Sequence, residues 1–326
     1  MKRFQNRIAE SWLTLPGVSL FVVCVWLLSG LVVNGWWAQL ACMAVSTYLM
    51  AELSNSNALL RVRSRMVSAT FLVFSATACF LFGSLAGGIV QLCFVAMFII
   101  LFRTYQDPLT QGWMFYAFLC LSLASLVWVQ CLYYVPLMWL LVAVELQSLS
   151  WRSWVATLIA LLTPYWFASL WVFYQQDVSL VVSHFSPLAE LSFPYDYGQL
   201  SISQIGSFSF VVLLMLVGAI HFWNRSFEDR IRIRQFYGFF FYVGLFSVVF
   251  LVLQPQHFNA LMRIVIVCAA PMAAHFFALT KTRATNVFFC VSLTIAVLLT
   301  AISLLEPRWG AISSTARELW NGLLNF

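Results

Sequence analysis

Residues 86–102 read AGGIVQLCFVAMFIILF, a run with no charged side chain and a single amide, Gln91. A helix of about 20 mostly apolar residues crosses the roughly 30 Å hydrocarbon core of a bilayer. The run is too long and too uniformly apolar for a strand of a membrane barrel, which has about ten residues of alternating polarity. It therefore predicts a transmembrane helix.

The rest of the chain repeats this pattern. Of its 326 residues, 63% are apolar and only 9% are charged, whereas an ordinary soluble domain carries about 25% charged residues. The net charge of +6 comes from short basic clusters between apolar runs, which is typical of membrane proteins and excludes a nucleic-acid binder. We predict one all-α, polytopic transmembrane bundle, residues 1–326, with about eleven spans: 17–33, 38–53, 67–84, 86–102, 112–129, 131–148, 154–174, 207–223, 236–253, 259–279 and 285–304.

The basic residues fall on alternate connections. Fourteen of the 17 Lys and Arg residues lie on the side that the positive-inside rule assigns to the cytoplasm. This asymmetry predicts a multi-pass protein of a bacterial inner membrane, with the N-terminus inside and the C-terminus outside. Residues 1–13 are expected to form an interfacial helix, and residues 307–326 an amphipathic helix on the outer surface.

The span over residues 259–279 carries the most informative polar groups. Asn259, Arg263 and His275 lie at helical steps of four or a multiple of four, and so share one stripe of the helix. Two interpretations of Arg263 stay open: it lines a cavity and holds an anion, or it reaches the lipid phosphates at the outer boundary. For His275 we favour a packed, hydrogen-bonded histidine over a functional one.

Residues 175–206 form the longest predicted loop, on the outer side. The loop has no Lys or Arg and is too apolar for a solvated linker, which favours a lid or a segment along the membrane surface. Its carboxylates are expected on the same side as Arg263, where they would form a substrate site or, alternatively, serve only salt bridging and anchoring. The candidate substrate-binding residues are Arg263, His257, Glu190, Asp196, His184 and Asn259; none is assigned a catalytic role.

Two arginine runs on the predicted cytoplasmic side, residues 61–65 and 230–234, form a second candidate site. Closely spaced guanidinium groups attract the phosphates of anionic lipids. The alternative is that they only fix the topology and anchor the protein to the membrane. The candidates for binding lipid head groups are Arg61, Arg65, Arg230 and Arg234.

Motifs for metal, nucleotide and covalent chemistry are absent from the sequence. The eight cysteines lie inside predicted spans and form no Cys-x-x-Cys pair, so they indicate neither disulfides nor a metal site. There is no Gly-rich phosphate motif with Lys, no His-Glu-x-x-His and no Gly-x-Ser-x-Gly. We expect no metal and no cofactor, and the sequence leaves open whether the chain is an enzyme.

Three segments carry a resemblance to known proteins. Residues 53–57 (LSNSN), 61–66 (RVRSRM) and 163–165 (TPY), with the late helix that contains Pro271, resemble an uncharacterised family of bacterial polytopic inner-membrane proteins. In layout the chain is also similar to the polymerases that join lipid-linked repeat units of surface polysaccharides. The first outer loop, residues 34–37 (NGWW), lacks the acidic residue usual in membrane glycosyltransferases that use polyprenyl-phosphate sugars, which argues against that class.

Three functions are consistent with these observations. The first is a protein of envelope biogenesis that handles a lipid-linked saccharide at the outer face. The second is a secondary transporter or lipid flippase that uses the polar stripe of residues 259–279. The third is a non-catalytic scaffold of a membrane complex. The partners expected are membrane lipids and, depending on the function, a lipid-linked glycan or other membrane proteins.

Overall fold

The structure of the chain is a computed structural model. It describes residues 3–62, 64–177, 179–189, 197–198 and 200–324, with side chains through residue 306. Within these ranges the secondary structure is helical and includes no strand. The all-α prediction is therefore confirmed.

Each of the eleven apolar stretches contains a helix. The helices in these stretches are α2 (Thr14–Leu28), α4 (Trp37–Asn57), α5 (Met66–Thr77), α6 (Leu85–Leu101), α7 (Gln111–Val127), α8 (Tyr134–Leu141), α9 (Trp151–Gln175), α11 (Ile202–Arg225), α12 (Ile231–Leu253), α13 (Phe258–Leu279) and α14 (Arg283–Leu324). The short elements are α1 (Phe4–Glu10), α3 (Leu31–Asn34), η1 (Cys79–Leu81), η2 (Phe102–Thr104), η3 (Val129–Tyr133), η4 (Val142–Leu146), α10 (Ser179–Ala189), η5 (Ser226–Glu228) and η6 (Pro255–His257).

The lengths of these helices decide how many can cross a bilayer. In the described part of the chain, seven are long and apolar enough, or eight if α1 and α2, which meet at an angle of 92°, count as one span. By contrast, α5 has 12 residues and rises only about 18 Å at 1.5 Å per residue. These helices indicate a membrane protein, while the count of eleven and the orientation of the termini stay predictions.

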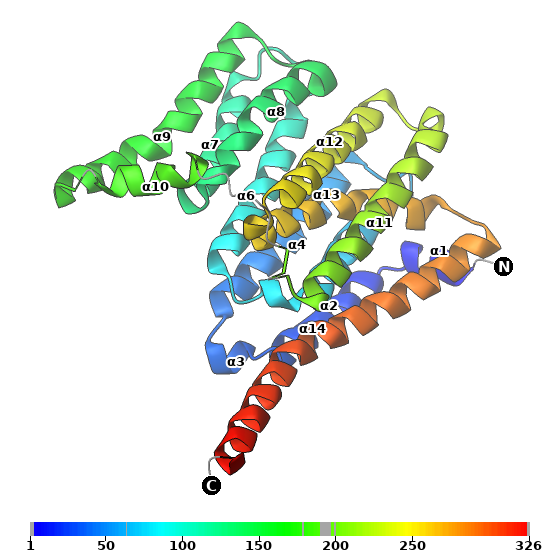
Figure 1. The fold of residues 1–326 in the computed structure, drawn as a ribbon. Helices are drawn as coiled ribbons and strands as arrows, with labels where there is room; N and C mark the ends of the chain where they lie inside the picture. The colour runs from blue at the N-terminus through cyan, green and yellow to red at the C-terminus, as the bar shows by residue number, and fades with distance from the viewer. Residues whose placement is uncertain (1–2, 63, 178, 190–196, 199, 325–326) are drawn as a thin grey trace.

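Helix α13 is the central element of the bundle. It packs against α1, α5, α6, α11 and α12, and Figure 1 shows it enclosed by other helices. Nineteen of its 22 residues are buried. Close packing is possible because small residues face it: a side chain at Gly218 of α11 would meet the backbone of Met272 and Ala273. Without a strong hydrophobic drive between helices in lipid, such close contacts supply much of the association energy.

One edge of the bundle is exposed. Helix α9 packs on α7, yet only four of its 25 residues are buried, and its outward side chains are large and apolar. Helix α10, which lies within the predicted outer loop, runs beside α9, and together they form an arm at the edge of the molecule (Figure 1). An exposed apolar surface of this kind fits contact with lipid rather than with water.

The first helix, α1, and the first part of the last helix, α14, pack on the bundle. Gln5 and Asn6 of α1 bond to the end of α13 and the residues that follow it, including Thr280. Helix α14 contacts α2 and α11, then projects past the bundle (Figure 1). It is one continuous helix to Leu324. The side chains after residue 306 lie outside the described ones, so the amphipathic outer tail, like the interfacial position of residues 1–13, stays a prediction.

Candidate functional site

Two polar clusters lie at opposite ends of α13. Arg263 is one and a half turns from its start, and His275 one turn from its end. Both side chains are buried, and they are the arginine and the histidine that this helix contributes to the protein interior. Each is surrounded by residues from other helices, so each cluster is formed by tertiary packing.

The cluster near His275 opens onto a large cleft, here called the basic cleft. Its volume is about 630 Å³, within the range of roughly 300–1,000 Å³ typical of small-molecule sites. The end of α11, η5, the connection after α4 and the segment that joins α13 to α14 form its walls. The lining residues that carry polar groups are Arg61, His221, Arg225, Glu228, Thr280, Lys281, Thr282 and Thr285.

Positive charge predominates in the basic cleft. Glu228 pairs with Arg225 at 2.9 Å and also with Arg61. Lys281 has no acidic partner among the described residues, so the lining carries three cations against one carboxylate. Lys281 and the outer face of Arg225, whose side chain is 59% exposed, are therefore the groups left to bind an anion.

A buried carboxylate lies behind this lining. Asp229 accepts a hydrogen bond from Arg61 Nε at 2.6 Å and one from His275 Nε2 at 3.2 Å. Burial alone would raise the pKa of Asp229, but these two bonds outweigh it and lower that pKa below its ordinary value. The same bond to Asp229 raises the pKa of Arg61. The packed, hydrogen-bonded histidine expected at position 275 is what the structure shows.

His221 connects the cleft to this buried group. It lines the basic cleft, and its ring centroid lies 5.6 Å from that of His275. Because the carboxylate of Asp229 can only accept a hydrogen bond, Nε2 of His275 carries the proton in this bond. When the His275 ring is neutral, its Nδ1 is therefore an acceptor. Nδ1 of His275 and Nδ1 of His221 are both buried without a described partner. The arrangement places two imidazoles between the cleft and Asp229.

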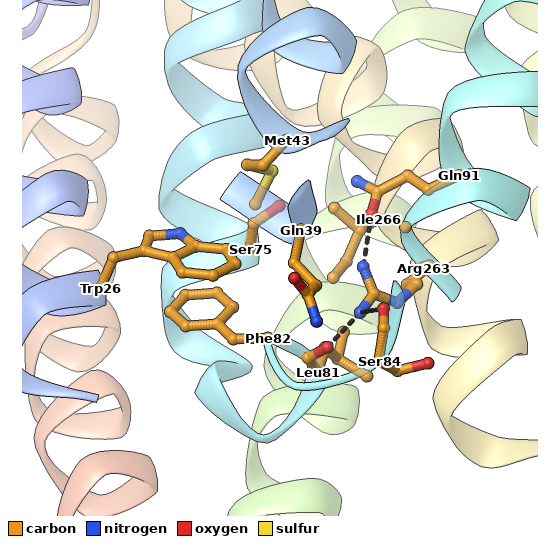
Figure 2. Close-up of a pocket in the computed structure, with 11 residues that line it drawn as sticks. Trp26, Gln39, Met43, Ser75, Leu81, Phe82, Ser84, Gln91, Arg263 and Ile266 are labelled. Carbon is orange, nitrogen blue, oxygen red and sulfur yellow. Dashed lines mark hydrogen bonds between the residues drawn. The ribbon is translucent and has the colours of Figure 1, made fainter. Parts of the chain in front are cut away.

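The second cluster surrounds Arg263. The guanidinium donates to Gln91 Oε1 at 3.0 Å, to the Ser84 carbonyl at 3.3 Å and to the Leu81 carbonyl, as Figure 2 shows. The residue is 6% exposed. Its contacts therefore point into the bundle, which favours the cavity interpretation over one in which it reaches the lipid phosphates. Gly87 makes room for it, since a Cβ there would lie 2.5 Å from Arg263 Nε.

The other predicted substrate-binding residues contact different elements. His257 lies within 3.2 Å of Gln130 in η3, Asn259 accepts from Gln204 in α11 at 3.3 Å, and His184 of α10 packs on Tyr165 of α9. None of these bonds joins them to Arg263. Glu190 and Asp196 lie outside the described residues, so the predicted outer site remains a hypothesis.

The predicted lipid head-group residues also separate. Arg61 is a wall of the basic cleft, whereas Arg65 lines a different cleft, of about 640 Å³, with Glu10. Arg230 and Arg234 are exposed. The sequence analysis did not single out Asp229, His221 or Lys281. One feature of the sequence points to Asp229. It is one of two acidic residues in an otherwise basic connection, where neighbouring cations can form ion pairs with it.

The described part of the chain holds neither a cluster of metal ligands nor a disulfide. No group of three or more His, Cys, Asp or Glu side chains has the arrangement to hold a metal ion there, and the eight cysteines are free. No protein-family model, curated protein or solved structure matches this chain.

Proposed function

We propose that this chain is a multi-pass protein of a bacterial inner membrane that binds a phosphate-bearing lipid in the basic cleft and moves it across the bilayer. A lipid-linked saccharide belongs to this substrate class. The observation that carries the proposal is the basic cleft itself, a ligand-sized opening whose Lys281 has no acidic partner among the described residues. The proposal corresponds to the flippase alternative of the sequence analysis.

The position of the cleft supports a lipid ligand over a soluble one. Its walls come from connections that the positive-inside rule assigns to the cytoplasm. A head group at this depth would meet Lys281 and Arg225 while its acyl chains stay in the bilayer. Each basic residue near a membrane surface contributes about 1 kcal/mol to binding an anionic lipid.

The buried groups give the cleft a route for protons. A bound phosphate changes the charge next to His221, and His221 is adjacent to the His275–Asp229 pair. Each imidazole can accept a proton at one ring nitrogen and donate one from the other. Proton movement through these groups would couple lipid transport to a proton gradient.

A second candidate function is the handling of a lipid-linked saccharide at the outer face. The observation in its favour is a groove of about 770 Å³ between α7, α9 and α10, lined mostly by aliphatic and aromatic side chains together with His184 and Tyr165. Tyr133 bonds to the Leu188 carbonyl and holds α10 over this region. A polyprenyl chain is apolar enough to fit the groove, with its head group toward the predicted outer loop.

Reconstituted vesicles test the first proposal. The double variant Arg225→Gln/Lys281→Gln removes about 2 kcal/mol of head-group attraction, so its affinity for a fluorescent phosphate-bearing lipid should fall roughly 30-fold. Transbilayer movement of that lipid at subsaturating concentration should fall with it. Arg152→Gln, an exposed arginine at the start of α9, is the matched control and should behave as wild type.

The results separate the three functions. If Arg225→Gln/Lys281→Gln moves the lipid as well as the control Arg152→Gln does, the basic cleft is excluded as the binding site. Absence of movement in wild type, with a stable co-purifying membrane protein, would support the scaffold. Loss of surface glycan on changing the carboxylates of residues 190–196, with normal lipid movement, would support the outer-face function.

A further inference from the structure

The Arg263 cluster surrounds a second, much smaller cavity. Its volume is about 10 Å³, on a measure where one water molecule needs roughly 10–15 Å³. The cavity is lined by side chains from α2, α4, α5, α6 and α13 and by the η1 turn (Figure 2). A phosphate group or a sugar is far too large for it. Any occupant is a single particle about the size of a water molecule.

Unpartnered polar atoms concentrate at this cavity. Nine buried side-chain nitrogen or oxygen atoms in the described residues have no hydrogen-bond partner. Three of them belong to residues that line it, Trp26 Nε1, Ser75 Oγ and Gln91 Nε2, and a fourth, Arg263 Nε, lies on the Gly87 side of the guanidinium. The four residues are at most 6% exposed. A buried polar group without a partner costs about 1–3 kcal/mol, so this concentration indicates a missing partner.

The chemistry of these atoms identifies that partner as an acceptor. The indole, amide and guanidinium nitrogens can only donate. The orientation of the Gln91 amide is fixed, because its oxygen must face the Arg263 donor and its nitrogen therefore faces away. In Figure 2 this nitrogen points toward the side of the cavity where the Ser75 hydroxyl lies. The unpartnered nitrogens of the lining therefore need a lone-pair acceptor.

Charge distinguishes an anion from a water molecule. Arg263 has no acidic partner among the described residues, and its acceptors are the neutral oxygens of Gln91, Leu81 and Ser84. The cavity also lies beside the first turn of α6, where the dipole of the helix adds positive potential. A water molecule would leave the charge of the guanidinium without a counter-ion. An anion supplies the acceptors and neutralises the guanidinium.

We propose that this cavity binds one monatomic halide anion, chloride under physiological conditions, held by Arg263, Gln91, Ser75 and Trp26. The site lies on the other half of α13 from the basic cleft and does not depend on the proposed lipid function. Its role is to supply the counter-charge that an arginine inside the membrane requires. It thereby holds α13 against α6 and α5 and links them to Trp26 of α2.

Thermal unfolding of the purified full-length protein tests the proposal. Sodium chloride is titrated against sodium gluconate at constant ionic strength, with sulfate as an anion too large for the cavity. Wild type should gain thermal stability with chloride and with bromide, and not with sulfate. Ser75→Ala keeps the fold and removes one hydrogen bond to the anion, so roughly tenfold more chloride should be needed for the same gain. Arg152→Gln should show the wild-type response.

A structural readout completes the experiment. Crystals grown in bromide should show an anomalous peak within hydrogen-bonding distance of the Gln91 amide nitrogen and the Ser75 hydroxyl. Equal stability of wild type in chloride and gluconate, together with no bromide peak at Arg263, would show that water alone fills the cavity and would overturn the proposal. A halide response that Ser75→Ala leaves unchanged would also overturn it.

Discussion

Replacing Gly218 by alanine is the most direct perturbation of the helix packing that positions both clusters. A Cβ at this position of α11 would lie 2.6 Å from the carbonyl carbon of Met272 and 3.0 Å from the backbone nitrogen of Ala273. The obstacle is the backbone of α13, which cannot rotate aside as a side chain can. Helices α11 and α13 must therefore separate to accept even one methyl group.

The expected magnitude follows from two opposing effects. Overpacking a tight interior lowers the free energy of unfolding by about 1–3 kcal/mol. Alanine in place of glycine in a helix interior raises it by up to about 1 kcal/mol. Because backbone atoms form the obstacle, we expect the upper part of the range and a net loss of about 2 kcal/mol. Since α11 also carries His221 and Arg225, lipid binding in the basic cleft should weaken as well.

Gly17→Ala in α2 is the matched control. A Cβ there meets no atom within 4 Å, so this change should be neutral or stabilise the protein by up to about 1 kcal/mol. The free energies of unfolding of both variants can be measured by titration with a denaturing detergent. The packing argument fails if Gly218→Ala proves as stable as Gly17→Ala.

Two further substitutions test the local electrostatics and capping. Asp229→Asn takes the charged acceptor from Arg61 and His275 and should cost about 1.5–3 kcal/mol. The pKa of Asp229 is lowered from 3.8 in the folded protein, so the stability that this carboxylate contributes is complete above that value and is lost as the pH falls through the lowered pKa. The difference in unfolding free energy between wild type and Asp229→Asn should therefore be constant at neutral pH and shrink only below about pH 4. Ser201→Ala removes the N-cap of α11, where the side chain accepts from the Gln204 backbone N–H at 3.2 Å, and should lower the melting temperature by the equivalent of about 1 kcal/mol.

The helical class could be predicted because each apolar run is long and carries at most one charged residue. A helix satisfies its own backbone hydrogen bonds, so a run such as residues 86–102 has few alternatives in lipid. The number of spans is harder to predict. Helix α4 has 21 residues, but polar groups such as Gln39, Thr47 and Glu52 lower its hydropathy. Whether such a helix crosses the membrane depends on which neighbours cover those groups.

The candidate site was predictable only in part. Arg263 was identified because a charged residue inside an apolar run is costly and rare. Its acceptors Gln91 and Ser84 are more than 170 positions away in the sequence, and no spacing rule connects them. Asp229 could not be identified in this way, because a charged residue among other charged residues is common. It follows Glu228 in a connection rich in charged residues, where one more carboxylate is unremarkable until the fold buries it beside His275.

The most direct test of the proposed function is to map where a phosphate-bearing lipid binds. The protein in nanodiscs is irradiated with a lipid whose photoreactive group lies next to the phosphate, and the labelled peptides are identified by mass spectrometry. The account predicts labelling of residues 221–228 and 276–285, reduced by excess phosphate-bearing lipid and by Arg225→Gln/Lys281→Gln, but not by an uncharged diacylglycerol. Labelling spread along the exposed face of α9, insensitive to that variant, would contradict it.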